Sequence, residues 1–141
     1  MHIPGHLAVG LASHRLLTLA NPDKAIPLRP LLLASLFPDV VDKSLGYVFH
    51  VMPNGRHYAH NIFALIVLWL AVTLVWGKQV GLAWLVGYWG HLLGDGRKVP
   101  WLFPLKSYKF YPGRLRFNVA QFGRESIFLL VVLFVYQVSR R

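Results

Sequence analysis

The chain contains no cysteine, which excludes disulfides, thiolate metal ligands and a cysteine nucleophile. Acidic residues are also scarce: five Asp and Glu stand against 15 Lys and Arg, and charged residues make up 14% of the 141 residues. Soluble domains carry about 25% charged residues, whereas here hydrophobic residues account for 55%. The composition therefore indicates a membrane protein, in which any metal must be held by histidine and carboxylate.

The net charge of +10 bears on partners. In a soluble protein such a charge points to nucleic acid, but in an apolar chain it more often reflects anionic lipid and membrane topology. We therefore expect membrane lipids as partners and do not expect nucleic acid. Neither an internal repeat nor a Ser/Gly-rich linker interrupts the chain, so we predict one domain over residues 1–141.

Apolar runs predict the helices. The strongest, Ile62 to Trp76, contains nothing more polar than Thr73 and covers about 22 Å as a helix. The short connection Gly77-Lys78-Gln79 predicts an antiparallel hairpin with the next run. We predict an all-α integral membrane bundle of about four to five helices, some of them short or re-entrant. The expected helices are 6–20, 29–39, 60–77, 79–95 and 125–139.

Histidines and carboxylates recur at the ends of these helices. With alternating helix directions, His6, Asp39, His60 and Asp95 all fall at one face of the bundle, and His91 lies one turn before Asp95. A buried carboxylate needs a partner. We predict that these five residues bind a divalent metal as one or two ions, with zinc favoured and manganese or iron as alternatives.

These residues also have structural alternatives. His91 and Asp95 could form an ion pair at a helix end, and Asp39 could cap the segment that follows it. For Asp42 we favour a structural role, as the partner of a nearby basic side chain. We expect interfacial or structural roles for His2, His14 and His50.

Two residues near His60 are candidates for catalysis. Arg56 would be costly to bury unpaired, so it either holds Asp39 or Asp42 or binds an anionic substrate. His57 is spaced i, i+3 from His60, which places two imidazoles on one face. We predict catalytic roles for Arg56 and His57.

The segment 97–124 holds seven basic residues, many aromatic residues and no acid. Such a segment should lie along the lipid headgroups. A turn at Pro112-Gly113 would make it a basic, aromatic lip over the site. Most basic residues fall on the site side of the bundle, so the positive-inside rule places the metal site near the cytoplasmic face of a multi-pass inner-membrane protein.

Four segments occur in order: MHIPGHLAVG, SLFPDVVDK, PNGRHYAHN and GHLLGD. Together they resemble the YdjM-like family of membrane-bound metal-dependent hydrolases of bacteria and archaea. The resemblance covers roughly the first hundred residues and implies hydrolysis with a bound metal. Asn61 departs from it, since the family often has Ser or Thr there. So does Gly55-Arg56, where the family often has His-Arg, and this leaves His57 offset from the pattern.

The order of candidate ligands is also similar to that of zinc-dependent phospholipase C. The later His-xxx-Glu of such enzymes is missing, because no histidine follows His91, so at most two ions could be held. The basic lip and a shallow site favour a phosphate-bearing or lipid substrate, so we predict hydrolysis of a phosphoester or lipid-type substrate through a metal-activated water. The alternative is a non-catalytic membrane protein with a structural His/Asp site that serves lipid binding or assembly. The sequence does not indicate the oligomeric state.

Overall fold

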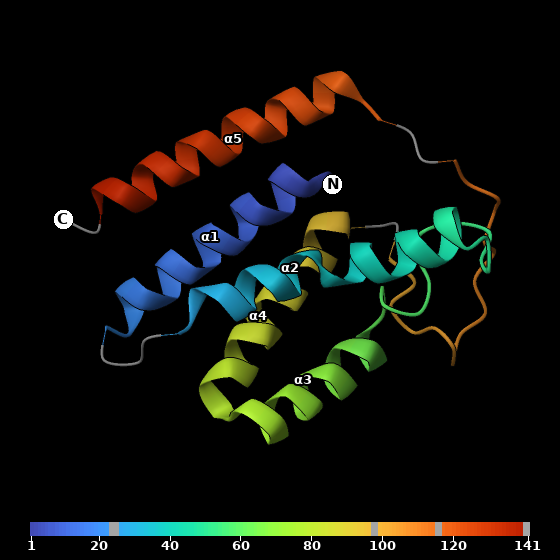
Figure 1. The fold of residues 1–141 in the computed structure, drawn as a ribbon, viewed down its shortest axis with the longest axis horizontal. Helices are drawn as coiled ribbons and strands as arrows, with labels where there is room; N and C mark the ends of the chain where they lie inside the picture. Colours follow the sequence, from blue (N-terminus) through green and yellow to red (C-terminus); the bar gives the residue numbers. More distant parts are fainter. Residues whose placement is uncertain (23–25, 97–98, 115–116, 140–141) are drawn as a thin grey trace.

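The structure, a computed structural model, describes residues 1–22, 26–96, 99–114 and 117–139. These residues form five α-helices and one π-helical turn, with no strand among them (Figure 1). The prediction of an all-α protein with four to five helices is confirmed. The elements are α1 (Ile3–Ala20), α2 (Leu28–Lys43), the π-helical turn η1 (Ser44–Val48), α3 (Ile62–Trp76), α4 (Lys78–Asp95) and α5 (Val119–Val138).

Three helix ends differ from the prediction by three residues or more. Pro4 in the first turn lets α1 begin at Ile3, since proline is preorganised for a helix start and needs no N–H partner there. α2 continues four residues beyond Asp39, which therefore lies inside a helix and is not a cap. α5 begins at Val119 because the Asn118 side chain accepts a hydrogen bond from the Gln121 N–H and caps it.

The α3–α4 hairpin turns on a single residue. Gly77 has φ of 86°, a conformation that glycine adopts without steric cost, and α4 begins directly after it. The two helices double back as a V in Figure 1. The Asn61 side chain caps the start of α3 by accepting from the Ala64 N–H at 2.9 Å. The predicted hairpin is present, with a shorter connection than expected.

The helices α2 and α4 cross closely. A Cβ placed on Gly87 of α4 would lie 2.1 Å from the carbonyl oxygen of Leu31 in α2, so only glycine fits this crossing. The fully buried Ala34, Tyr88 and Leu92 form the apolar core nearby. This core ends where the candidate ligands begin, and it fixes the end of α4 against α2.

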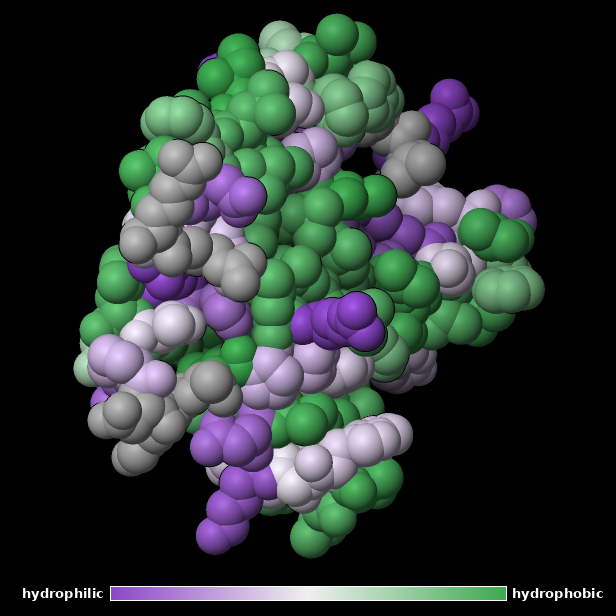
Figure 2. Space-filling model, turned by 60° about the vertical axis from the view of Figure 1, so that its left-hand side comes forward, coloured by the Kyte–Doolittle hydropathy of each residue, from purple (hydrophilic) through white to green (hydrophobic). Residues whose placement is uncertain are grey.

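α5 lies outside this core and runs alongside α1 in the same direction (Figure 1). Polar contacts hold it at both ends: Glu125 accepts from the His2 N–H at 2.7 Å, and Ser139 Oγ accepts from Arg15 Nε at 2.6 Å. Among the described helices, α5 alone is both long and apolar enough to cross a membrane, and none of its residues is buried. α3 is apolar but has 15 residues. Hydrophobic side chains also cover much of the face in Figure 2.

Candidate metal centre

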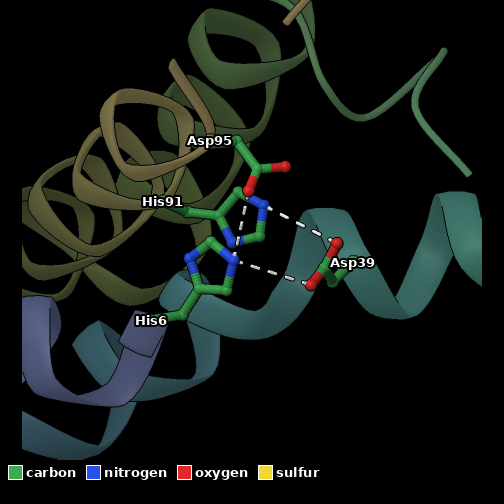
Figure 3. A group of neighbouring side chains, drawn as sticks. All are labelled: His6, Asp39, His91 and Asp95. Carbon is green, nitrogen blue, oxygen red and sulfur yellow. Dashed lines mark ion pairs between the residues drawn. The ribbon is translucent and has the colours of Figure 1, made fainter. Parts of the chain in front are cut away.

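Three helices bring four potential ligands together. His6 of α1, Asp39 of α2, and His91 and Asp95 of α4 each offer a ligand atom, and these atoms lie within 4.8 Å of one another (Figure 3). All four residues are buried. His6 Nε2 is 3.6 Å from Asp39 Oδ2 and 3.5 Å from Asp95 Oδ1. The helix ends therefore converge as the alternating arrangement predicted.

His60 joins this group from the loop before α3. Its Nε2 atom lies 3.5 Å from Asp39 Oδ1, 3.6 Å from Asp95 Oδ2 and 3.1 Å from His91 Nε2. The His60 side chain is fully buried. All five residues that the sequence predicted as metal ligands thus lie in one cluster, although their role as ligands stays a prediction.

The outer nitrogens of two imidazoles have oxygen partners. His60 Nδ1 lies 2.8 Å from Asp42 Oδ2, and His91 Nδ1 lies 2.7 Å from the backbone carbonyl of Ser35. A carbonyl only accepts, so His91 carries a proton on Nδ1, and a neutral His91 then presents a lone pair at Nε2. Metal-binding histidines are typically oriented in this way.

Asp42 holds both the His60 ring and the backbone of the loop before α3. Its carboxylate accepts from the backbone N–H of His57 at 2.6 Å and of Ala59 at 3.0 Å. The sequence favoured a structural role, with a basic side chain as partner, whereas the structure gives Asp42 a histidine and two backbone amides. The available signal was its i, i+3 spacing from Asp39, which puts both carboxylates on one helix face. The Ser35 carbonyl left no side-chain signal at all.

Cations surround the two carboxylates of the cluster. Arg56 Nε donates to Asp95 Oδ2 at 2.7 Å, and the Met1 amino group also contacts Asp95. Lys43 Nζ donates to Asp39 Oδ2. Arg56 was expected to hold Asp39 or Asp42, or to bind a substrate, and in the structure its carboxylate partner is Asp95. Burial would lower the pKa of Arg56, but the hydrogen bond and charge of Asp95 raise it.

His60 is strongly basic in this setting. Burial alone would lower its pKa, but the nearby carboxylates of Asp39, Asp42 and Asp95 outweigh burial and raise the pKa to about 10. In the metal-free protein at neutral pH, His60 is therefore an imidazolium. A metal that binds through His60 must displace this proton.

The residues fit a bound cation. His6 Nδ1 and Nε2 and Asp39 Oδ1 are buried and have no hydrogen-bond partner, a costly arrangement unless another group satisfies them. Three imidazoles and two carboxylates, with no thiolate, are a donor set for zinc, manganese or iron. The arrangement can therefore hold a divalent ion, and its identity is not fixed by these donors.

His57 is buried but its ring faces elsewhere. The ring packs on Phe110 with 3.9 Å between centroids, and neither ring nitrogen has a hydrogen-bond partner. Burial lowers the pKa of His57, against the opposing charge of Asp42. Its catalytic role stays a prediction. Of the other histidines, His14 bonds to the Ile26 carbonyl at the far end of α1, and His50 is exposed.

The basic, aromatic segment folds back onto the loop before α3. The Gly113 N–H donates to the Pro53 carbonyl at 2.8 Å, and Asn54 Nδ2 donates to the Tyr111 carbonyl at 3.1 Å. Residues of these two segments, together with Tyr47, line a cavity of about 400 Å³. Residues 97–98 and 115–116 of the expected lip lie outside the described residues, and Arg124 belongs to α5. The cavity lining comprises Tyr47, Asn54, Arg56, Val99, Pro100, Tyr108, Lys109, Phe110, Tyr111 and Gly113.

The chain is similar to one family of known proteins. The sequence profile of a family described as YdjM inner membrane protein matches residues 1–141. The chain belongs to this family. The YdjM match extends beyond the first hundred residues, in which the four motifs occur, and includes α5. Searches of curated proteins and of solved structures gave no significant match.

Proposed function

We propose that this YdjM family protein is a metal-dependent hydrolase of the inner membrane that cleaves a phosphoester or lipid-type substrate. The observation that carries the proposal is the buried cluster of three imidazoles and two carboxylates. Two of the imidazoles, His60 and His91, are held in place by hydrogen bonds to groups outside the cluster. His60 is held by Asp42 and His91 by the Ser35 carbonyl. This cluster also adjoins a cavity, as a catalytic site requires.

The ion would be held by His6, Asp39, His60, His91 and Asp95, with zinc as the favoured metal. When bound, it would supply Lewis acidity and an activated water molecule. The chain's own contribution is orientation, because Asp42 and Ser35 fix which nitrogens face the ion. Burial of the cluster keeps bulk water out and strengthens its electrostatic interactions.

Arg56 connects the cluster with the cavity. Its Nε donates to Asp95, and the same side chain lines the cavity. A guanidinium has five N–H donors, so Arg56 can hold a ligand carboxylate and stabilise negative charge on a substrate at the same time. His57, under the aromatic wall formed by Phe110, is the candidate for proton transfer.

We further propose that the protein crosses the membrane more than once, with the metal centre near the cytoplasmic face. α5 supplies one span, and the α3–α4 hairpin would supply two shorter ones. The excess of Lys and Arg at the site end supports this orientation.

The competing interpretation is a non-catalytic protein with a metal-free ion-pair cluster. Lys43, Arg56 and the His60 imidazolium neutralise the carboxylates without any ion. Such a cluster would serve stability or assembly. It predicts a protein that neither contains nor takes up metal.

The decisive experiment is metal analysis of protein purified in detergent without added metal. We expect about one or two equivalents of zinc, manganese or iron by elemental mass spectrometry. His91→Ala and Asp39→Asn should lose the metal. His14→Ala is the matched control, since it removes a buried histidine about 12 Å along α1 from His6. A metal-free wild type that also fails to take up added metal would overturn the proposal.

Hydrolysis is tested separately with bis(p-nitrophenyl) phosphate and dioctanoyl phosphatidic acid. Release of p-nitrophenol or phosphate by the metal-loaded wild type and by His14→Ala, but not by His91→Ala, is the expected result. Metal binding without hydrolysis of either probe would favour a structural metal site in a non-catalytic protein over phosphoester cleavage.

A further inference from the structure

The cavity beside the metal centre has a cationic and hydroxylic lining. Arg56 comes from the loop before α3, and Lys109 from the segment 99–114. Among the described residues that line the cavity there is no Asp or Glu, while three are tyrosines. Its volume of about 400 Å³ is within the range of small-ligand pockets, about 300–1,000 Å³. These features favour an anionic ligand.

Arg56 lies between the cavity and the metal centre. Its Nε atom is 2.7 Å from Asp95 Oδ2, and its side chain is part of the cavity wall. A phosphate bound to the remaining guanidinium N–H groups would therefore lie next to the cluster. Lys109 approaches the same cavity from the opposite segment and is exposed at its mouth.

Exposed apolar side chains occur on the two segments that supply the cavity lining. Val48, Phe49 and Val51 follow the lining residue Tyr47 and are 67%, 66% and 69% exposed. On the other segment, Leu102 and Leu105 are 48% and 81% exposed. Single exposed apolar residues are common, but groups of them on both segments that line the cavity favour an apolar ligand or surface there.

The position of α5 indicates at which level of the membrane the cavity lies. The segment 99–114 precedes α5, the candidate span that begins at Val119. In Figure 1 this segment and the loop before α3 lie at the same end of the molecule as the start of α5. A cavity at the start of a span lies at headgroup level, with its apolar rim at the acyl boundary.

We infer that this cavity binds the phosphate headgroup of an anionic lipid through Arg56 and Lys109, while the acyl chains stay beside the exposed apolar rim. This inference deepens the proposed function, and it rests on that function for the statement that the bound lipid is the substrate. The lipid phosphate would reach the metal centre from the membrane surface.

The test measures binding to detergent-solubilised protein by titration calorimetry at constant detergent concentration. The probes are dioctanoyl phosphatidic acid, dioctanoylglycerol, which has the same chains without phosphate, and inorganic phosphate. We expect phosphatidic acid to bind at least about tenfold more tightly than either fragment, because only it contacts both the cationic lining and the rim. Lys109→Ala should weaken binding about fivefold. Lys78→Ala, an equal loss of charge at the start of α4, should leave it unchanged.

The outcomes separate this inference from the hydrolase proposal. Tight phosphatidic acid binding that depends on Lys109 but is accompanied by no hydrolysis supports the lipid site and counts against the enzyme. Equal binding of inorganic phosphate and phosphatidic acid overturns the lipid assignment and leaves a site for soluble phosphate esters. Equal binding of dioctanoylglycerol, or insensitivity to Lys109→Ala, overturns the headgroup site even if metal-dependent hydrolysis is found.

Discussion

His60 Nε2 and His91 Nε2 face each other at 3.1 Å, and the outer nitrogen of each ring has an oxygen partner. His91 has its proton on Nδ1, so its Nε2 offers a lone pair. Two neutral rings in this arrangement would bring two lone pairs together. A positive group must therefore lie between them, either the His60 proton in the metal-free protein or a metal ion in its place.

This exchange of a proton for a metal predicts pH-dependent metal affinity. The pKa of His60 is raised to about 10, so metal binding must release its proton at neutral pH. Between about pH 7 and 9, zinc affinity measured against a chelator should rise by about tenfold per pH unit from this proton alone. His60→Gln should flatten the dependence while lowering the affinity. A wild-type affinity that does not change with pH would contradict the exchange.

The stability of the metal-free protein should change in the opposite direction. Because the pKa of His60 is raised on folding, its ion pairs contribute fully below about pH 6.5 and are lost as pH rises through about 10. The Tm of chelator-treated protein should therefore fall from pH 7 to pH 10. The variant His60→Gln should show a shallower fall, and bound zinc should remove it. An unchanged slope in the variant would mean that another group carries the dependence.

Asp42 supports the site without belonging to the ligands. Asp42→Asn should keep a side chain of the same size but weaken the orientation of His60 and of the loop amides at His57 and Ala59. Loss of such an outer partner typically costs 10–100-fold in metal affinity. Chelator competition would measure it, with Glu125→Gln as a control that removes an acid outside the cluster. Unchanged affinity would show that Asp42 serves only the loop.

The sequence predicted the convergence of the cluster because helix direction and position were enough. His6, Asp39, His60 and Asp95 sit near helix ends, and the prediction took successive helices to alternate in direction. The outer partners were harder to predict. The carbonyl of Ser35 is a backbone group and leaves no trace in the residue pattern. The partner of Arg56 depended on which loop rotamer reaches Asp95, and no helical spacing fixes that.

The glycines of α4 also show which features the sequence can predict and which it cannot. Gly90 and Gly94 form a small-xxx-small pair, a spacing that predicts close packing on α4. The close contact with the backbone of α2 lies at Gly87, where a Cβ would be 2.1 Å from the Leu31 carbonyl oxygen. Gly90 and Gly94 instead face side chains of Val9 and Met1. Spacing identified the packed helix, while the contact point depended on the angle at which α2 crosses it.

Gly87→Ala should consequently destabilise the α2–α4 contact. The added methyl group meets backbone, which cannot move aside as a side chain can, so a loss of about 1–3 kcal/mol in the free energy of unfolding is expected. Gly123→Ala in α5 is the control, since its Cβ meets nothing within 4 Å and should be neutral or slightly stabilising. Thermal unfolding in detergent measures both. Equal Tm values for the two variants would contradict the close crossing.

Arg56→Lys separates charge from geometry. Lysine keeps the positive charge but cannot pair with Asp95 and a substrate phosphate through one planar group. We expect metal content to remain and the rate of phosphoester hydrolysis to fall about 10²-fold, as for loss of an anion-stabilising donor. Arg15→Lys, which alters the arginine paired with Ser139, is the control. Loss of metal together with activity would instead assign Arg56 to the support of Asp95.

The absence of native cysteine permits a direct test of topology. Lys78 and Leu105 are exposed, one at the α3–α4 turn and the other in the segment before α5. If the hairpin crosses the membrane and the metal centre is cytoplasmic, Lys78→Cys should react with an impermeant maleimide in intact spheroplasts. Leu105→Cys should react only after permeabilisation. Reaction of Leu105→Cys alone from outside would reverse the assigned face of the site, and reaction of both would exclude a hairpin that crosses the membrane. Protection of both would mean that α3 and α4 stay on the cytoplasmic side and α5 alone spans.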